Sequence, residues 1–211
     1  LVALDATDVE RWPEAVVRLC QAVQAGPPLP ASRPPCPYPG MRAFRREEAP
    51  QFYGRESEIA GLLQRLRLYP FVAIIGASGS GKSSLVSAGL LPALQRSTLF
   101  GAGGWVVRMF RPGAEPLAAM QTALGGVELE QFTPAPLLAT EQDAAHVLLV
   151  IDQFEELFTQ GADQVEAFCA AIQRFVALRA CYLVMTVRAD FFGELLSSAL
   201  WPLLQSHRLE I

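Results

Sequence analysis

Residues 71–83, Phe71-Val-Ala-Ile-Ile-Gly-Ala-Ser-Gly-Ser-Gly-Lys-Ser83, decide the fold, because in them an apolar run leads directly into a loop of glycine and serine. The short apolar run indicates a buried β-strand, and the residues that follow the loop, to about Leu94, have the spacing of a helix. The loop matches the pattern G-x-x-x-x-G-K-[ST] in full. A strand, a glycine-rich loop and a helix in this order predict a phosphate site at the helix N-terminus.

Each part of this loop has an expected role in binding a nucleotide. Glycine lets the backbone approach an anion, because no Cβ intervenes. Lys82 is expected to reach the β- and γ-phosphates, and the Ser83 hydroxyl to bind Mg²⁺. Lys82 is also the only lysine among 17 basic residues, which indicates a position where a planar guanidinium does not fit. The expected nucleotide-binding residues of the loop are Gly76, Ala77, Ser78, Gly79, Ser80, Gly81, Lys82, Ser83 and Ser84.

Composition excludes several classes of protein. The chain has 211 residues, 51% of them hydrophobic and 18% charged, with a net charge of −4. These values exclude collagen, coiled coil and general disorder, and they make nucleic acid an unexpected partner. The sequence has no apolar run long enough for a membrane span and no signal peptide, so we expect a cytoplasmic chain with no membrane partner. None of the four cysteines belongs to a C-x-x-C pair, and two histidines complete no zinc pattern.

The chain is expected to contain three parts. Residues 1–25 have the pattern of a strand followed by a helix, which suggests the end of a preceding α/β domain. Residues 26–40 include seven prolines and predict an extended linker, because proline breaks helices and central strands. Residues 41–211 form the main domain. Because residue 1 is leucine and the chain stops within an expected strand, we expect an excerpt of a longer protein.

Within residues 41–211, apolar runs alternate with helical patterns, which predicts an α/β fold with helices on both faces of a parallel sheet. The expected strands are 71–75, 105–110, 147–151, 181–187 and a fifth from residue 209. The expected helices are 56–68, the helix after the loop, 115–124, 165–178 and 191–204, with an irregular stretch over 125–143.

Acidic residues follow the third expected strand. Asp152 comes directly after the apolar run 147–151, and this position favours binding of Mg²⁺ together with Ser83 at the carboxyl edge of the sheet. Glu155 or Glu156 would orient or deprotonate the attacking water, and we prefer Glu156. The alternative for either glutamate is a solvated helix start.

An arginine follows the fourth expected strand. Thr186 and Arg188 would emerge at the same edge of the sheet, where Arg188 could sense or neutralise charge at the γ-phosphate. The alternative is a structural salt bridge from Arg188 to Asp190 or Glu194.

Several motifs in order resemble the bacterial novel STAND NTPase 1 domain. Guanine recognition is excluded, because an Asn-Lys-x-Asp loop is absent and the chain has no asparagine. The motifs that carry the resemblance are Cys36–Phe44, Phe52–Glu56, Gly76–Ser84, Arg111–Leu117, Asp152–Phe158 and Thr186–Phe191. The resemblance implies a P-loop NTPase of the ASCE/STAND type with strand order 5-1-4-3-2. It also implies that Tyr53, Gly54 and Arg55 lie along the adenine and ribose.

The same resemblance implies a function. It predicts an ATPase of slow turnover, with ATP or ADP and Mg²⁺ as ligands. It also predicts that the protein self-associates on activation and couples an N-terminal effector to C-terminal sensor repeats such as WD40, in bacterial immunity or stress signalling. Residues 1–25 resemble the last strand and helix of a TIR domain. Two alternatives stay open, namely a nucleotide-dependent scaffold without turnover and a small-molecule P-loop kinase.

Overall fold

The computed structural model describes Pro13, Val16, Val17, Cys20, Gly40, residues 42–205 and residues 207–211. The chain divides into two units, Leu1–Tyr38 and Pro39–Ile211. The four described residues of the first unit are helical and exposed. The strand of the expected TIR-like segment 1–25, and the linker over 26–39, lie outside the described residues. All other described residues belong to the second unit.

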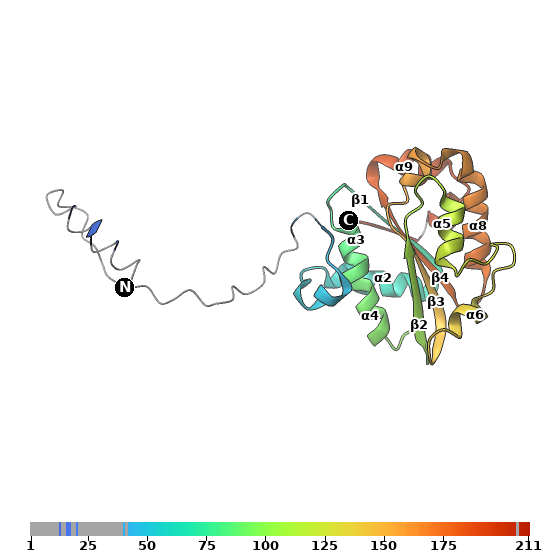
Figure 1. Cartoon of the computed structure of the whole chain (residues 1–211), viewed down its shortest axis with the longest axis horizontal. Helices are drawn as coiled ribbons and strands as arrows, with labels where there is room; N and C mark the ends of the chain where they lie inside the picture. The colour runs from blue at the N-terminus through green and yellow to red at the C-terminus, as the bar shows by residue number, and fades with distance from the viewer. Residues whose placement is uncertain (1–12, 14–15, 18–19, 21–39, 41, 206) are drawn as a thin grey trace. The chain divides into compact units, whose positions relative to one another are not determined.

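A parallel sheet of five strands forms the centre of the second unit (Figure 1). Its strand order is β2-β3-β4-β1-β5, which is the predicted order 5-1-4-3-2 read from the other edge. Ile75 of β1 pairs with Val187 of β4, and Ile151 of β3 pairs with Met185, so these strands end at one edge of the sheet. The strands are β1 Phe71–Gly76, β2 Gly104–Phe110, β3 Ala144–Ile151, β4 Cys181–Arg188 and β5 Arg208–Glu210.

Helices cover both faces of the sheet, which suits its inner strands, because every position of β1 and most positions of β3 and β4 are buried. Alternate side chains of β1 enter two separate cores: Ala73 and Ile75 face one, and Val72 and Ile74 face the other. The first core contains α5 Pro116–Ala123, α8 Val165–Ala177, α9 Phe192–Ser197 and α10 Trp201–Leu204, and the second contains α2 Glu56–Leu68 and the helix after the glycine-rich loop (Figure 1). The shorter elements are η2 Arg46–Gln51, α6 Pro134–Leu138, α7 Glu156–Thr159, η4 Ala162–Gln164 and η5 Ala189–Phe191.

The helix after the loop contains a wide turn. It runs through α3 Lys82–Ser84, η3 Leu85–Leu90 and α4 Leu91–Arg96, and η3 is a π-helix in which the Leu91 N–H donates to the Val86 carbonyl. Pro92 accounts for this turn, because proline lacks an N–H and its ring clashes with the carbonyl four residues earlier in a regular helix. The helix thus continues past the proline and ends two residues beyond the predicted Leu94.

Two predicted elements were wrong. The single helix expected over 191–204 is broken into α9 and α10, because Ser198 has an extended backbone and its hydroxyl accepts the Leu200 N–H at 3.3 Å. The stretch 125–143, expected to be irregular, contains α6, which begins at Pro134. Proline is common in the first turn of a helix, because N–H groups in that turn have no acceptor within the helix. No helix in the described part of the chain is long and apolar enough to cross a membrane.

Candidate nucleotide and metal site

The loop between β1 and α3 uses glycine for two different reasons. Gly79 and Gly81 have φ of 77° and 91°, a left-handed conformation that strains any residue with a Cβ. An added Cβ at either position would meet no heavy atom within 4 Å, so backbone conformation alone requires glycine there. At Gly76, by contrast, a Cβ would lie 2.5 Å from the Ile211 carbonyl oxygen, so this glycine allows β5 and its end to approach.

Lys82 places its charge at the centre of this loop. Its side chain is buried, and Nζ donates to the carbonyls of Gly76 at 2.9 Å and Ala77 at 2.7 Å. Burial lowers the pKa of Lys82, and the negative charge of Glu155 is the largest opposing influence. The Ser80 hydroxyl is also buried and has no hydrogen-bond partner among the described residues. An ammonium group, an unpaired hydroxyl and a left-handed glycine backbone at a helix N-terminus fit a phosphate group.

Asp152 lies beside Ser83, as the two motifs separately predicted. The Ser83 hydroxyl donates to Asp152 Oδ1 at 2.7 Å, and the Thr186 hydroxyl donates to the same oxygen at 2.8 Å. These contacts form because β4 lies between β1 and β3, so Thr186 stands between the loop and the acid. The Asp152 side chain is buried, and a buried carboxylate needs such donors.

The Ser83 hydroxyl and the Asp152 carboxylate together fit a magnesium ion. Each group offers a hard oxygen ligand, and Ser83 uses its hydrogen toward Asp152, so the lone pairs of its oxygen are left for a cation. Over residues 42–205 and 207–211 no three His, Cys, Asp or Glu side chains gather as a metal cage. Magnesium commonly takes one or two protein ligands and fills the rest of its shell with waters and phosphate oxygens, so this small donor set suits it.

Glu155 and Glu156 point to different partners. Glu155 is buried, and its Oε2 accepts the Arg188 backbone N–H at 3.2 Å. Glu156 Oε2 accepts the Gly113 N–H at 3.1 Å, from the loop after β2. Glu155 is also the carboxylate that opposes the lowered pKa of Lys82 most strongly. Of the two candidates, Glu155 is therefore the one whose charge acts on Lys82 of the phosphate loop, although the sequence led us to prefer Glu156.

Arg188 lies at the predicted edge of the sheet, but its guanidinium has a partner on its own segment. Its Nε and Nη2 both donate to the Asp190 carboxylate, and its side chain is 42% exposed. The hydrogen bond from Arg188 lowers the pKa of Asp190. The structure therefore contains the salt bridge to Asp190 that the sequence left as the alternative, and Glu194 takes no part in it.

The segment expected to contact the base lies against the phosphate loop. Arg55 Nη2 donates to the Ser80 carbonyl at 3.3 Å, and Arg55 Nη1 pairs with Glu58 at 2.6 Å. Gly54 has φ of 81°, and its N–H donates to Glu56 at 3.0 Å. Tyr53 is 78% exposed, so its ring has an open face for stacking.

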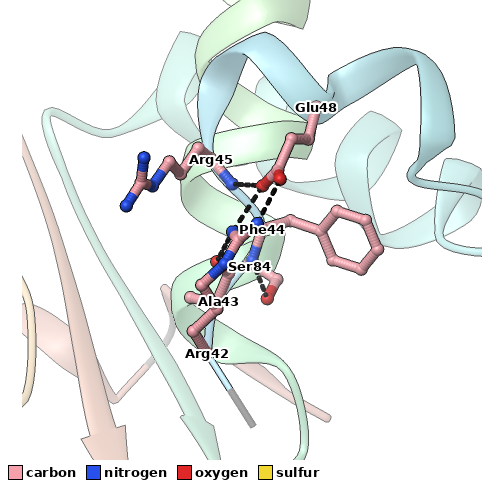
Figure 2. A network of polar contacts seen from close by, with 6 residues as sticks. All are labelled: Arg42, Ala43, Phe44, Arg45, Glu48 and Ser84. Carbon is pink, nitrogen blue, oxygen red and sulfur yellow. Dashed lines mark hydrogen bonds and ion pairs between the residues drawn. The ribbon is translucent and has the colours of Figure 1, made fainter. Parts of the chain in front are cut away.

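A short N-terminal segment, residues 42–51, crosses the helix that follows the loop; we call it the strap. Figure 2 shows its polar contacts. The Phe44 N–H donates to Ser84 Oγ at 3.1 Å, and Glu48 accepts from the Arg45 N–H and from Arg42 Nη1, both at 2.7 Å. Ser84, predicted to bind nucleotide, thus uses its hydroxyl to hold the strap.

Sequence reasoning assigned no role to Arg111 and Gly113. Arg111 Nη2 lies 3.4 Å from Asp152 Oδ2, and Gly113 donates to Glu156. The signal was present, because Arg111 comes directly after a strand whose carboxyl end reaches the same edge of a parallel sheet as Asp152. The Asp152 N–H also donates to the Phe110 carbonyl at 3.0 Å, which joins these two strand ends.

Comparison with solved structures finds proteins that are similar to this chain. The Walker-type ATPase PABY2304 of Pyrococcus abyssi is 15% identical over 80% of this chain and 55% of its own, with a TM-score of 0.49. The ORC2 protein of Aeropyrum pernix, solved in ADPNP–ADP complexes, is 11% identical over 76% of this chain and 48% of its own, with a TM-score of 0.53.

The chain thus spans about half the length of these two solved structures. At this identity the likeness to the ORC2 protein shows a shared fold alone. No curated protein matches the sequence. The model of one family, Novel STAND NTPase 1, matches residues 37–211, which include every element of the sheet and the whole candidate site. The chain belongs to the Novel STAND NTPase 1 family and is a P-loop NTPase.

Proposed function

We propose that the chain binds ATP with Mg²⁺, hydrolyses its γ-phosphate slowly, and acts as the switch of a signalling protein in bacterial defence or stress. In this proposal it couples an N-terminal effector to C-terminal sensor repeats and self-associates when ATP replaces ADP. The 2.7 Å contact between Ser83 and Asp152, beside the buried Lys82, is the observation that supports nucleotide binding most directly. The family match supports the NTPase activity.

In this proposal each group of the site has a separate role. Lys82 and the N–H groups of the loop bind the phosphates and neutralise their charge. Ser83 and Asp152 hold Mg²⁺, which when bound neutralises charge on the β- and γ-phosphates. Glu155, whose charge acts on Lys82, orients the attacking water and accepts its proton. Tyr53 stacks on the adenine, because its ring is exposed next to Arg55, which contacts the phosphate loop.

One observation favours a second candidate, a nucleotide-dependent scaffold without turnover. Glu155 and Glu156 each already accept a backbone N–H, from Arg188 and Gly113. Each of these bonds occupies a carboxylate oxygen and restrains the side chain, which would favour binding without turnover.

Two measurements on the same protein separate these functions. The first identifies the nucleotide released when the purified protein is denatured, by chromatography. The second follows phosphate release from ATP. A switch predicts bound nucleotide and slow release, whereas a scaffold predicts bound nucleotide and no release. Release that requires an added metabolite would instead indicate a kinase.

Variants assign the roles within the site. Lys82→Ala should abolish binding. Glu155→Gln should preserve binding and slow phosphate release about 100-fold, the scale of general-base catalysis. Glu166→Gln, on the exposed surface of α8, is the matched control and should change neither. If Glu156→Gln slows release and Glu155→Gln does not, the assignment of the base is wrong.

Self-association has its own test. Sedimentation of the purified chain with ATP and with ADP should show a larger species with ATP alone. The same mass with both nucleotides would leave an ATPase without the proposed switch.

A further inference from the structure

The loop between β2 and α5 belongs to the site, but the proposed function gives it no role. Arg111 extends from this loop toward Asp152, and its Nη2 lies 3.4 Å from Oδ2. The other carboxylate oxygen, Oδ1, already accepts two hydroxyl hydrogens, from Ser83 and Thr186. Among the described residues, Arg111 is the one cationic side chain within salt-bridge distance of Asp152.

The loop is anchored at Gly113 and through the Glu115 side chain, while the Arg111 side chain is largely exposed. Gly113 has φ of 56°, and its N–H donates to Glu156 at 3.1 Å. Further along, Gln164 Nε2 donates to Glu115 at 2.9 Å. The Arg111 side chain, by contrast, is 58% exposed, and 3.4 Å is a long contact for a charge-assisted hydrogen bond. The loop therefore fixes where Arg111 begins but allows its end to leave Asp152.

The position of this arginine has an electrostatic consequence. Asp152 is only 7% exposed, so its charge is weakly screened and would repel the phosphates of a nucleotide bound at the loop. A divalent cation held by Ser83 and Asp152 removes that repulsion. When no cation is present, the guanidinium at Oδ2 removes part of it.

We propose that Arg111 is a built-in replacement for the divalent cation, a counter-charge that pairs with Asp152 so that the site binds a nucleoside diphosphate without metal. Arg111 and the cation compete for the same carboxylate, and Arg111 leaves when the cation binds. This role rests on the proposed nucleotide site and adds to it a metal-independent mode of binding. Arg111 is thus a positioning residue that acts through Asp152.

Calorimetric titration with ADP, in excess EDTA and in excess Mg²⁺, tests this role. In EDTA, Arg111→Ala should bind ADP about tenfold more weakly than the unaltered chain, a change on the scale of one partly screened charge pair. In Mg²⁺ the two proteins should agree within about twofold, because the metal supplies the missing charge. Arg174→Ala is the matched control, since Arg174 is a similarly exposed arginine paired with Glu130, and it should change neither value.

A second readout needs no nucleotide. Binding of Mn²⁺ alone, followed by electron paramagnetic resonance, should be tighter in Arg111→Ala, because the competing guanidinium is gone. Unchanged Mn²⁺ affinity would overturn the proposal.

The ADP affinities of Arg111→Ala in EDTA and in Mg²⁺ also distinguish the proposed role from other roles of Arg111. An equal loss in EDTA and in Mg²⁺ would make Arg111 a direct phosphate ligand, and no loss in either would make its ion pair irrelevant to binding; each overturns the proposal. If the unaltered chain binds no ADP or ATP even with Mg²⁺, the proposed function fails. The Mn²⁺ measurement would still decide whether Arg111 competes with a cation.

Discussion

Thr186 contacts both Asp152 and the residue that follows it, Gln153. It is 1% exposed, donates to Asp152 Oδ1 at 2.8 Å and accepts the Gln153 N–H at 2.9 Å. Gln153 has φ of 57°, which is unfavourable for a residue other than glycine. The hydroxyl of Thr186 therefore stabilises both the orientation of Asp152 and the strained turn that follows it.

Removing this hydroxyl should destabilise the fold. Thr186→Val keeps the shape of the side chain but leaves the Gln153 N–H without its partner, so we expect a loss of about 1–3 kcal/mol in the free energy of unfolding. Urea unfolding measures it. Thr186→Ser, which keeps the hydroxyl, should lose less. Thr122→Val is the matched control, because Thr122 donates to Ala118 at 2.8 Å on the exposed surface of α5. Equal losses at residues 186 and 122 would contradict this account.

At the scale of elements, the glycine-rich loop depends on its backbone conformation more than on space. We expect Gly79→Ala and Gly81→Ala each to lower the free energy of unfolding by about 1–2 kcal/mol, the cost of a left-handed conformation for a residue with a Cβ. Thermal or urea unfolding checks the values. Gly193→Ala is the control, since Gly193 lies within α9, has room for a Cβ and does not have a positive φ. It should be stabilised by about 0.5–1 kcal/mol, because alanine favours helix. An unchanged free energy of unfolding in Gly81→Ala would contradict this prediction, because it would show that the loop accepts a Cβ at this position.

The strap should respond to pH. Hydrogen bonds from Arg42 and Arg45 lower the pKa of Glu48 from 4.5 to about 2. Because the folded pKa is the lower one, the contribution of Glu48 to stability is complete above about pH 4.5 and is lost as the pH falls toward 2. Glu48→Gln should therefore be less stable than the unaltered chain at pH 7, and the difference should disappear near pH 2.

Unfolding curves at several pH values test this prediction at low and high salt, since salt should reduce the difference for an exposed pair. Glu47→Gln, at the exposed neighbouring position, is the control. A difference that grows as the pH falls would contradict the assigned sign.

At the scale of the whole molecule, the sequence predicted the architecture better than the contacts within the site. Apolar runs and the glycine-rich loop predicted the strands and the meeting of Ser83 with Asp152, because the carboxyl ends of parallel strands share one edge. The order of the strands was implied by the family resemblance. The break between α9 and α10 had a signal that apolar periodicity across Ser198 concealed: Pro202 lacks an N–H, and in a continuous helix its ring would clash with the Ser198 carbonyl. The local hydrogen bond of Ser198 to the Leu200 N–H, by contrast, leaves no pattern in the sequence. Hydrogen bonds of Glu155 and Glu156 to backbone groups more than 30 residues away also leave no local pattern.

The same edge makes nucleotide a stabilising element of the whole domain. The phosphate loop, Asp152, Thr186 and Arg111 follow or end four different strands, so a ligand bound there connects β1, β2, β3 and β4. A ligand that binds only the folded state at about 100 times its Kd adds about 2.7 kcal/mol to the free energy of unfolding. For a domain of this size we therefore expect Mg²⁺ and ADP to raise Tm by about 5–10 °C.

Differential scanning calorimetry measures this shift. In Lys82→Ala the rise should disappear, because the ammonium at the centre of the loop is lost. Arg174→Ala, at an exposed position of α8, should keep the rise in full. The sheet would remain intact in both variants, so the comparison reports binding at the loop. An equal rise in Lys82→Ala would place the nucleotide elsewhere on the molecule and contradict the site as a whole.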